Sequence, residues 1–282
     1  MKTVEKNVSI TIMADNLSDS GLNTEHGLAL LIQANGYSIV FDTGQGTALF
    51  ANADAMNVDL KRPEMLVLSH GHYDHTGGIP ELLRINPGIR IFNHPEAMVN
   101  RYSCHPDKPV KDISMPDAAA AALDNHPRNL LRHITSPLEI LTGVWLTGEI
   151  PRIAPFEDVG GPFFLDNKGQ FQDSIIDDMA LWIETAAGLV IVLGCCHSGL
   201  VNTVEYIREL RGGSRVRGII GGMHLLHTSS ERLEQTCKKL QEWSPDFIIP
   251  CHCTGETAIT AMISLLGERV KTGKAGMVLK LP

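Results

Sequence analysis

The stretch "LSHGHYDHTGG" (68–78) crowds three histidines and one aspartate into six positions. It follows the apolar run "MLV" within a predicted strand at 65–69, and it ends in two glycines that permit unusual backbone angles. If the strand geometry persists, the side chains at 70 and 72 point the same way. Imidazole and carboxylate groups are ligands that zinc, iron and manganese prefer. A solvated histidine-rich loop is the weaker interpretation, so we predict a site for two metals.

The composition is that of an ordinary globular chain, with 282 residues, 43% hydrophobic and 20% charged. The net charge of -8 argues against binding of nucleic acid or acidic membranes by bulk electrostatics, so we predict a small-molecule substrate. The longest apolar runs, such as 189–193, are too short to span a bilayer, and the first residues lack a signal peptide. The cysteines in "CC" and "CHC" make poor disulfide frameworks, which favours reduced thiols and a cytoplasmic location.

Short apolar runs alternate with helical patterns along the chain. The apolar runs predict strands at 7–13, 27–33, 37–42, 65–69, 88–92, 179–184, 189–194, 217–221, 247–250 and 276–281. The periodic segments predict helices at 46–57, 79–86, 200–211, 229–242 and 255–267, with Thr228 as the N-cap of the fourth. Two segments, 100–137 and 150–176, look like insertions, the first with one short helix and the second as a long loop.

A faint internal repeat relates the two halves of the chain. "GYSIVFDTG" from Gly36 resembles "GLVIVLGCC" from Gly188, and "LVLSHGH" ending at His72 resembles "GIIGGMH" ending at His224, both 152 positions apart. The shared offset favours a duplicated unit over chance. Two mostly antiparallel sheets with flanking helices would then pack as an α+β, four-layer αββα sandwich, with ligands converging at one edge. We expect residues 1–282 to form a single domain that carries the two inserted segments as lids.

The signature "SHGHYDHTGG" resembles the HxHxDH motif of the metallo-β-lactamase superfamily. "IVFDTG" (39–44) is similar to the strand and turn that precede this motif, and "IIPCHCTG" (248–255) to the segment with the last histidine ligand. "EHGLALLI", "GCCHSGLVNT" and "GGMHL" are similar to one subgroup, described as 7,8-dihydropterin-6-methyl-4-(β-D-ribofuranosyl)-aminobenzene-5′-phosphate synthases. The resemblance covers nearly the whole chain and implies the αββα fold with a metal site at one edge.

The resemblance also implies a ligand set. His70 and His72 resemble ligands of a first metal, Asp74 and His75 resemble ligands of a second, and His252 resembles the last ligand of the second. Asp74, as a ligand, would also steer an attacking water and so count as catalytic.

Two positions depart from the family pattern. Glu149, in "LTGEIPR", stands where a third histidine is usual, and Cys195 stands where a bridging aspartate is usual. Alternation in an extended strand would bring Cys195 and His197 to the same side, so we predict His197 as the replacement ligand of the first metal. Cys195 is either a bridging thiolate or a small buried apolar residue, and Glu149 is a ligand or a substrate contact.

For other polar residues the sequence gives less support for a role in the site. We predict that His224 faces the site as a proton donor or substrate contact, with a core histidine as the alternative, and that His26 orients another ligand. The resemblance implies that Asp42 steadies the signature loop by a hydrogen bond. Arg152 is a candidate phosphate contact. The histidines expected on the surface or in a lid are His94, His105, His126, His133 and His227.

The chemistry that this set predicts is that of a metal-dependent enzyme. The sequence contains no phosphate-binding GxxxxGK[ST] loop, no strand-linked GxGxxG and no GxSxG elbow. The leading hypothesis is a hydrolase that uses one or two divalent metals, zinc first and iron or manganese as alternatives, on a small anionic metabolite. The subgroup suggests a synthase that joins a dihydropterin pyrophosphate to a ribofuranosyl arylamine phosphate. The third hypothesis, motivated by Cys195, is a catalytically degraded metal-binding sensor.

Overall fold

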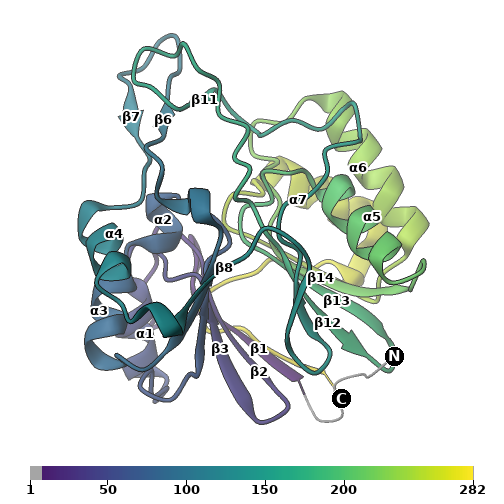
Figure 1. Ribbon diagram of the computed structural model, residues 1–282. Coiled ribbons are helices and arrows are strands. Elements are labelled where there is room, and N and C mark those ends of the chain that lie inside the picture. The colour runs from purple at the N-terminus through teal and green to yellow at the C-terminus, as the bar shows by residue number, and fades with distance from the viewer. Residues whose placement is uncertain (1–7, 282) are drawn as a thin grey trace.

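The computed structural model describes residues 8–281, in which two β-sheets pack face to face (Figure 1). In this part of the chain the first sheet has seven strands, in the order β16 (Val278–Leu281), β1 (Val8–Ala14), β2 (Ala29–Ala34), β3 (Tyr37–Phe41), β4 (Met65–Val67), β5 (Arg90–Asn93) and β8 (Leu131–His133). The second has six, in the order β15 (Phe247–Cys251), β14 (Val216–Gly222), β13 (Gly188–Leu193), β12 (Leu181–Thr185), β10 (Val144–Leu146) and β9 (Leu138–Leu141).

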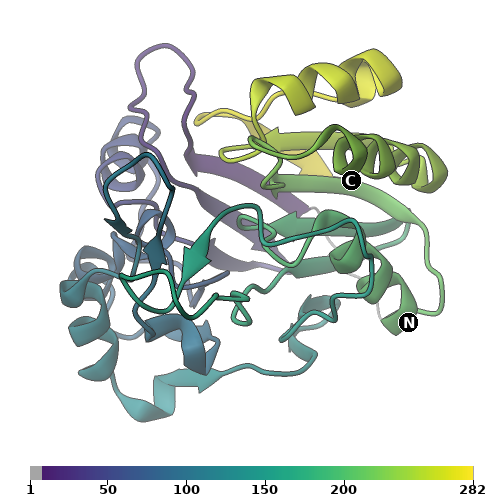
Figure 2. The same ribbon diagram turned by 90° about the horizontal axis from the view of Figure 1, so that it is seen from above.

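Helices cover the outer faces of both sheets, with one group on each side (Figure 2). Beside the first sheet lie α1 (Ala48–Ala55), α2 (Tyr73–Thr76), α3 (Ile79–Ile85), α4 (Asp117–Asp124) and the 3₁₀ turns Pro95–Met98 and Arg128–Leu130. Beside the second lie α5 (Leu200–Leu210), α6 (Ser230–Trp243), α7 (Glu256–Leu266) and the 3₁₀ turn Gly267–Arg269. The predicted α+β, four-layer αββα sandwich is therefore confirmed.

Both sheets are mixed. The first has three antiparallel and three parallel pairings, so the prediction of a mostly antiparallel sheet is wrong there, and the second has three antiparallel and two parallel pairings. β2 pairs antiparallel with β3, and β3 then pairs parallel with β4. β12, β13 and β14 repeat this pattern in the second sheet. These strands begin close to 152 positions after their counterparts, which agrees with the predicted repeat. The parallel strands place several carboxyl ends at one edge of each sheet.

Strand alternation sorts the apolar residues into separate cores. Along β12 and β13, Leu181, Ile183, Val190 and Val192 face the first sheet, and Trp182 and its outward neighbours face the second set of helices. Because both faces of these strands are buried, they read in the sequence as continuous apolar runs. A third core lies between the first sheet and helices α1, α3 and α4.

Helix α6, the fourth of the predicted helices, begins with a different N-cap residue from the one predicted. Ser229, and not Thr228, is the N-cap of α6, and its hydroxyl accepts a hydrogen bond from the amide of Arg232. The sequence analysis also missed the short strands β8, β9 and β10. Of these, β9 and β10 are mainly apolar, and each has only three or four residues.

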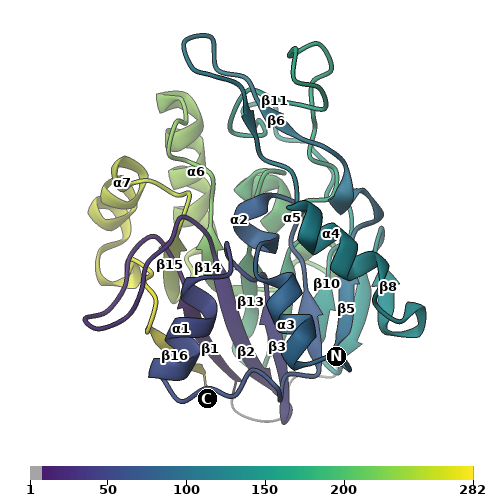
Figure 3. The ribbon, with the colours of Figure 1, turned by 90° about the vertical axis from the view of Figure 1, so that its left-hand side faces the viewer.

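The inserted segments build an arm that projects beyond the sandwich (Figures 1 and 3). Here the arm means residues 101–113 and 160–173, which contain β6 (Tyr102–Ser103), β7 (Lys111–Asp112) and β11 (Phe163–Phe164) in a small sheet. The rest of 100–137 does not project, because α4 packs on α3 and β8 extends the first sheet.

Arg101 anchors the arm at its base. The guanidinium is 1% exposed, and it donates to Asp173 Oδ2 at 2.8 Å and to Asp177 Oδ1 at 2.6 Å. The other oxygen of Asp177 accepts the amide of Gly71, inside the HxHxDH signature, at 2.8 Å. Any side chain at Gly71 would clash, since a Cβ there would lie 1.8 Å from Ala97 O. Both inserted segments and the signature are thus joined by one buried ionic cluster.

We expect Arg101→Ala to lower the free energy of unfolding by about 3–5 kcal/mol, because the change leaves two buried carboxylates without their cation. Urea unfolding followed by circular dichroism measures this loss. Arg84→Ala is the matched control, since Arg84 forms a two-point pair with Glu81 in solvent and should have little effect. Equal losses in the two variants would contradict the anchoring role.

Candidate metal centre

The candidate ligands lie where strands of both sheets end at a common edge. The HxHxDH loop follows β4, and Cys195 and His197 follow β13. His224 and His252 follow β14 and β15. Four non-glycine residues at this edge have left-handed backbone conformations, namely Asp42, Cys196, His224 and His252. Such strain is concentrated at functional sites, where the surrounding packing holds it in place.

Three buried imidazoles form the first part of the centre. Ring atoms of His70, His72 and His197 able to bind a metal lie within 4.8 Å of one another. His70 Nε2 is 2.9 Å from His72 Nδ1, so the two side chains do point the same way. His197 Nδ1 donates to Val159 O at 2.8 Å, which leaves its Nε2 as the free lone pair. This is the arrangement expected for one cation held by three nitrogen atoms.

A buried carboxylate orients the second part. Asp42 Oδ1 accepts the amide of Ser69 at 2.7 Å, and Oδ2 accepts both Ser69 Oγ at 2.6 Å and His75 Nδ1 at 2.7 Å. Because the Ser69 hydroxyl donates to Asp42, it accepts from His70 Nδ1 at 2.9 Å. His75 Nε2 then faces Cys195 Sγ at 3.1 Å. The carboxylate thus holds the signature loop through Ser69 and fixes the direction of two histidines.

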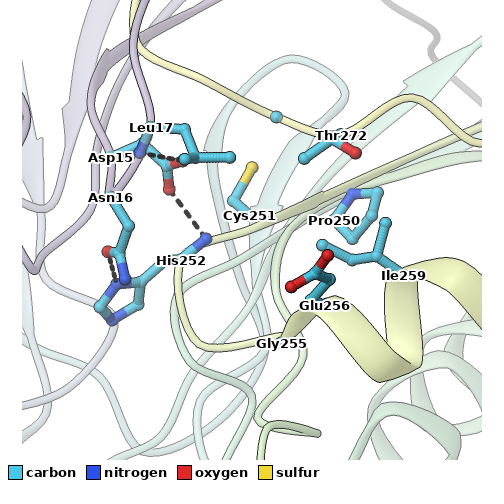
Figure 4. Close-up of a pocket in the computed structure, with 11 residues that line it drawn as sticks. Asp15, Asn16, Leu17, Pro250, Cys251, His252, Gly255, Glu256, Ile259 and Thr272 are labelled. Carbon is cyan, nitrogen blue, oxygen red and sulfur yellow. Dashed lines mark hydrogen bonds between the residues drawn. The ribbon is translucent and has the colours of Figure 1, made fainter.

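His252 is held by the loop after β1. Its backbone amide donates to Asp15 Oδ1 at 2.8 Å, and its ring Nδ1 donates to Asn16 Oδ1 at 2.8 Å (Figure 4). Its Nε2 therefore faces the centre, 3.3 Å from Asp74 Oδ2. A neighbouring pocket of about 460 Å³, drawn in Figure 4, shares Asn16 and His252 with the site. Asn16 gave no signal in the sequence, since its partner lies 236 positions away.

Asp74 and His26 complete one side of the centre. Asp74 is buried in α2, and its Oδ2 also lies 3.2 Å from His26 Nε2. Burial would raise the pKa of Asp74, but hydrogen bonds from His252 and His26 hold it well below its usual range. His26 is thus placed to orient Asp74, and its donor atom groups with those of Asp74 and His252.

Two further donors extend the cluster. His224 lies with its ring 4.2 Å from that of His197, and its Nδ1 has no hydrogen-bond partner. Cys253 brings a buried thiol to within 4.8 Å of donor atoms on Cys195 and His252. His224 lines the pocket, so it is available as a donor or a substrate contact.

The donor set fits a transition metal. The Nε2 atom of His197 is buried without a hydrogen-bond partner, which is costly for a polar atom unless something else binds it. Burial holds the pKa values of His70, His72 and His197 well below the usual range, so these rings are neutral and keep a lone pair for a cation. Burial also raises the pKa of the Cys195 thiol, and the adjacent Cys253 raises it further.

The donors open into a pocket of about 430 Å³. Phe163 from the arm covers one side, with its ring 5.6 Å from that of His72 and 5.4 Å from that of His197. The remaining walls come from both sheet edges and the arm. They include Asn16, Tyr73, Ser103, Lys108, Lys111, Ile113, Leu226 and His227.

Several predicted positions lie elsewhere. The Glu149 carboxylate is 44% exposed and 3.3 Å from His94 Nε2, outside the donor groups found among the described residues. Arg152 is not free for a phosphate, because its guanidinium donates to the carbonyls of His197, Ser174 and Ile175.

Two of the histidines expected at the surface or in a lid are buried instead. His94 accepts the amide of Glu96 as a helix cap, and His126 Nε2 donates to Ile89 O. The other three, His105, His133 and His227, are partly or well exposed.

A family model described as the metallo-beta-lactamase superfamily matches residues 22–153. A protein of Methanocaldococcus jannaschii named 7,8-dihydropterin-6-methyl-4-(β-D-ribofuranosyl)-aminobenzene-5′-phosphate synthase is 30% identical over 289 aligned residues, covering 97% of each chain. The structure of Tm1679, described as a metal-dependent hydrolase of the beta-lactamase superfamily, matches with a TM-score of 0.82 at 27% identity, covering 97% of this chain and 99% of that one. Zinc-bound PqqB from Methylobacterium extorquens, at 11% identity and a TM-score of 0.59, shares the fold and covers 97% of this chain and 100% of that one.

We expect zinc binding to release a proton from His75. Burial lowers and the Asp42 carboxylate raises the pKa of His75, with a net value of about 9. At pH 7 this ring is therefore protonated, and a metal at Nε2 must displace the proton. Between pH 7 and 8.5, the apparent zinc affinity of the wild type should rise about tenfold more per pH unit than that of Asp42→Asn. Competition with a chromophoric chelator measures both slopes, and equal slopes would contradict this coupling.

Asn16→Ala should weaken zinc binding by about 10- to 100-fold, because the His252 ring loses the acceptor that fixes its direction. Asn16→Asp keeps an oxygen at the same place and should stay within a few-fold of the wild type. The same chelator competition measures both variants. A wild-type affinity in Asn16→Ala would show that Asn16 does not orient the ligand.

Proposed function

Because the chain belongs to the metallo-β-lactamase superfamily, we propose that it is a metal-dependent hydrolase of a small anionic metabolite. The observation that carries the proposal is the convergence of neutral, unpartnered imidazole nitrogens and one carboxylate on a pocket of about 430 Å³. The described residues contain no helix with the length and apolar character to cross a membrane.

The ligand roles that we propose follow the geometry. His70, His72 and His197 would hold one metal. A second would take His75, Asp74 and His252, with Cys195 between the two groups. Thiol and imidazole donors favour zinc, with iron next and manganese last. Divalent metals, when bound, lower the pKa of water and stabilise negative charge on a substrate oxygen.

The remaining steps belong to the protein itself. Asp74 stays ionised in the pocket, so its carboxylate can accept a proton from an attacking water. His224 lines the pocket with an unpartnered Nδ1, which places it to donate a proton to a leaving group. Phe163 covers the donors and limits the access of bulk water to them. The free thiols of the six cysteines fit a reducing compartment, and we propose the cytoplasm.

A synthase is the second candidate, favoured by the relative from Methanocaldococcus jannaschii, whose match covers 97% of this chain. In that reaction the centre would bind the leaving pyrophosphate of a dihydropterin substrate, and an arylamine would attack in place of water. A pocket that combines candidate metal ligands with two lysines is compatible with both reactions. The two reactions differ in the nucleophile, water or an arylamine, so analysis of their products distinguishes them.

Zinc-loaded protein should hydrolyse at least one member of a colorimetric panel of phosphodiester, lactone, thioester and β-lactam substrates. Asp74→Asn should lower kcat by about 10²- to 10⁴-fold, because it removes the candidate proton acceptor and a ligand. Asp54→Asn, an exposed carboxylate on α1, is the matched control and should keep full activity. Zinc content measured in parallel separates loss of metal from loss of chemistry.

The results of these assays distinguish the hydrolase, the synthase and the sensor. Product formed only from a dihydropterin pyrophosphate and a ribofuranosyl arylamine phosphate, detected by mass spectrometry, would replace the hydrolase with the synthase. Tightly held iron and no turnover of either kind would favour a sensor. Full activity and unchanged metal content in Asp74→Asn would remove the basis of both enzymatic proposals.

A further inference from the structure

The pocket at the candidate metal centre has a second polar feature, supplied by the arm. Lys108 and Lys111 both line this pocket, together with Ser103 and Phe163 from the same arm. The arm lies beyond α2, the helix that carries Asp74 (Figures 1 and 3). One cavity is therefore lined by part of the donor cluster and by two lysines.

The charges that line this pocket are unbalanced. Asp74 is the one carboxylate among its described lining residues, and it is already paired with His26 and His252. The chain as a whole carries a net charge of -8, so a pocket with two lysines and one paired acid stands out against its surroundings. A cavity with an excess of positive charge attracts ligands of negative charge.

Lys111 is held close to the candidate ligands. Its Nζ donates to Tyr73 Oη at 2.6 Å and lies 4.3 Å from the centre of the Tyr73 ring. Tyr73 directly precedes Asp74 at the start of α2. An anion bound by Lys111 would thus be within reach of the metal-binding groups.

Lys108 is exposed in a short turn of the arm. Its amide donates to His105 O, and Pro106 and Pro109 flank the turn and restrict its backbone. No ion pair of its ammonium is found within residues 8–281. The base of the arm is fixed by Arg101, so both lysines are presented by an anchored element and lose less entropy when they bind.

We propose that Lys108 and Lys111 form a subsite for a phosphate or diphosphate group of the substrate. The proposal rests on the proposed function insofar as it places a substrate in this pocket. Two ammonium groups match a multiply charged anion, whereas a single carboxylate would use only one of them. The Ser103 side chain, in the same wall, is available as a neutral hydrogen-bond donor.

The test uses inorganic pyrophosphate as the probe and zinc-loaded full-length protein. Calorimetric titration should show that the double variant Lys108→Ala/Lys111→Ala binds pyrophosphate about tenfold more weakly than the wild type, and with a weaker salt dependence. Lys168→Ala, an exposed lysine of the arm that does not line the pocket, should bind like the wild type. Lys108→Arg/Lys111→Arg should restore most of the affinity.

The zinc content of all variants should be equal, since neither lysine is a candidate ligand. Pyrophosphate affinity unchanged in the double alanine variant, or lowered equally in Lys168→Ala, would overturn the proposal even if the protein hydrolyses its panel substrates. A lysine-dependent affinity without hydrolysis would instead leave the subsite standing and reject the hydrolase. A matched titration with acetate should show little dependence on the lysines, and an equal dependence would reject the preference for multiply charged anions.

Discussion

The geometry of the candidate centre depends on the buried carboxylate of Asp42. It lies directly after β3, and it binds the backbone and hydroxyl of Ser69 after β4 and the ring of His75 in α2. A carboxylate buried this deeply is very costly unless it is fully hydrogen-bonded, so these three contacts hold the loop in one conformation. Through Ser69 the same contact network also orients His70. One side chain thereby sets the direction of donor atoms in both parts of the cluster.

The duplicated sheet pattern explains why the donors converge from distant parts of the chain. His72 follows β4 and His224 follows β14, at equivalent positions of the two halves. Within each sheet, parallel pairing aligns the carboxyl ends of neighbouring strands. The rings of His72 and His197, 4.9 Å apart, show that the edges of the two sheets meet. Apolar cores between the sheets and under both helix layers keep this edge rigid. The halves have diverged in chemistry, with a carboxylate and histidines on one side and thiols with histidines on the other.

The sequence predicts what local patterns encode. The layered fold follows from strand and helix periods, and the HxHxDH cluster is evident because its residues are adjacent in the chain. Glu149 is a position where the sequence pattern does not predict the direction of the side chain. The family pattern gives its place in the chain, but its carboxylate contacts His94 and not the candidate centre. His94 and His126 lie in polar stretches, and only packing by distant elements buries them. The Arg101 contacts span 72 and 76 positions, and no local signal marks them.

The replacement of an expected aspartate by Cys195 changes the electrostatics of the pocket. Burial keeps the Cys195 thiol protonated when no cation is beside it. A divalent metal would stabilise the thiolate, so Cys195 would lose its proton when the metal binds. His70, His72 and His197 are neutral imidazoles, and Asp74 is the carboxylate among the described residues that line the pocket. A metal-loaded centre of this composition retains positive charge, which the arm lysines reinforce from outside. The proposed attraction of an anionic ligand would therefore depend on the whole pocket, both on the strand ends and on the arm, which the sequence indicated only as an insertion.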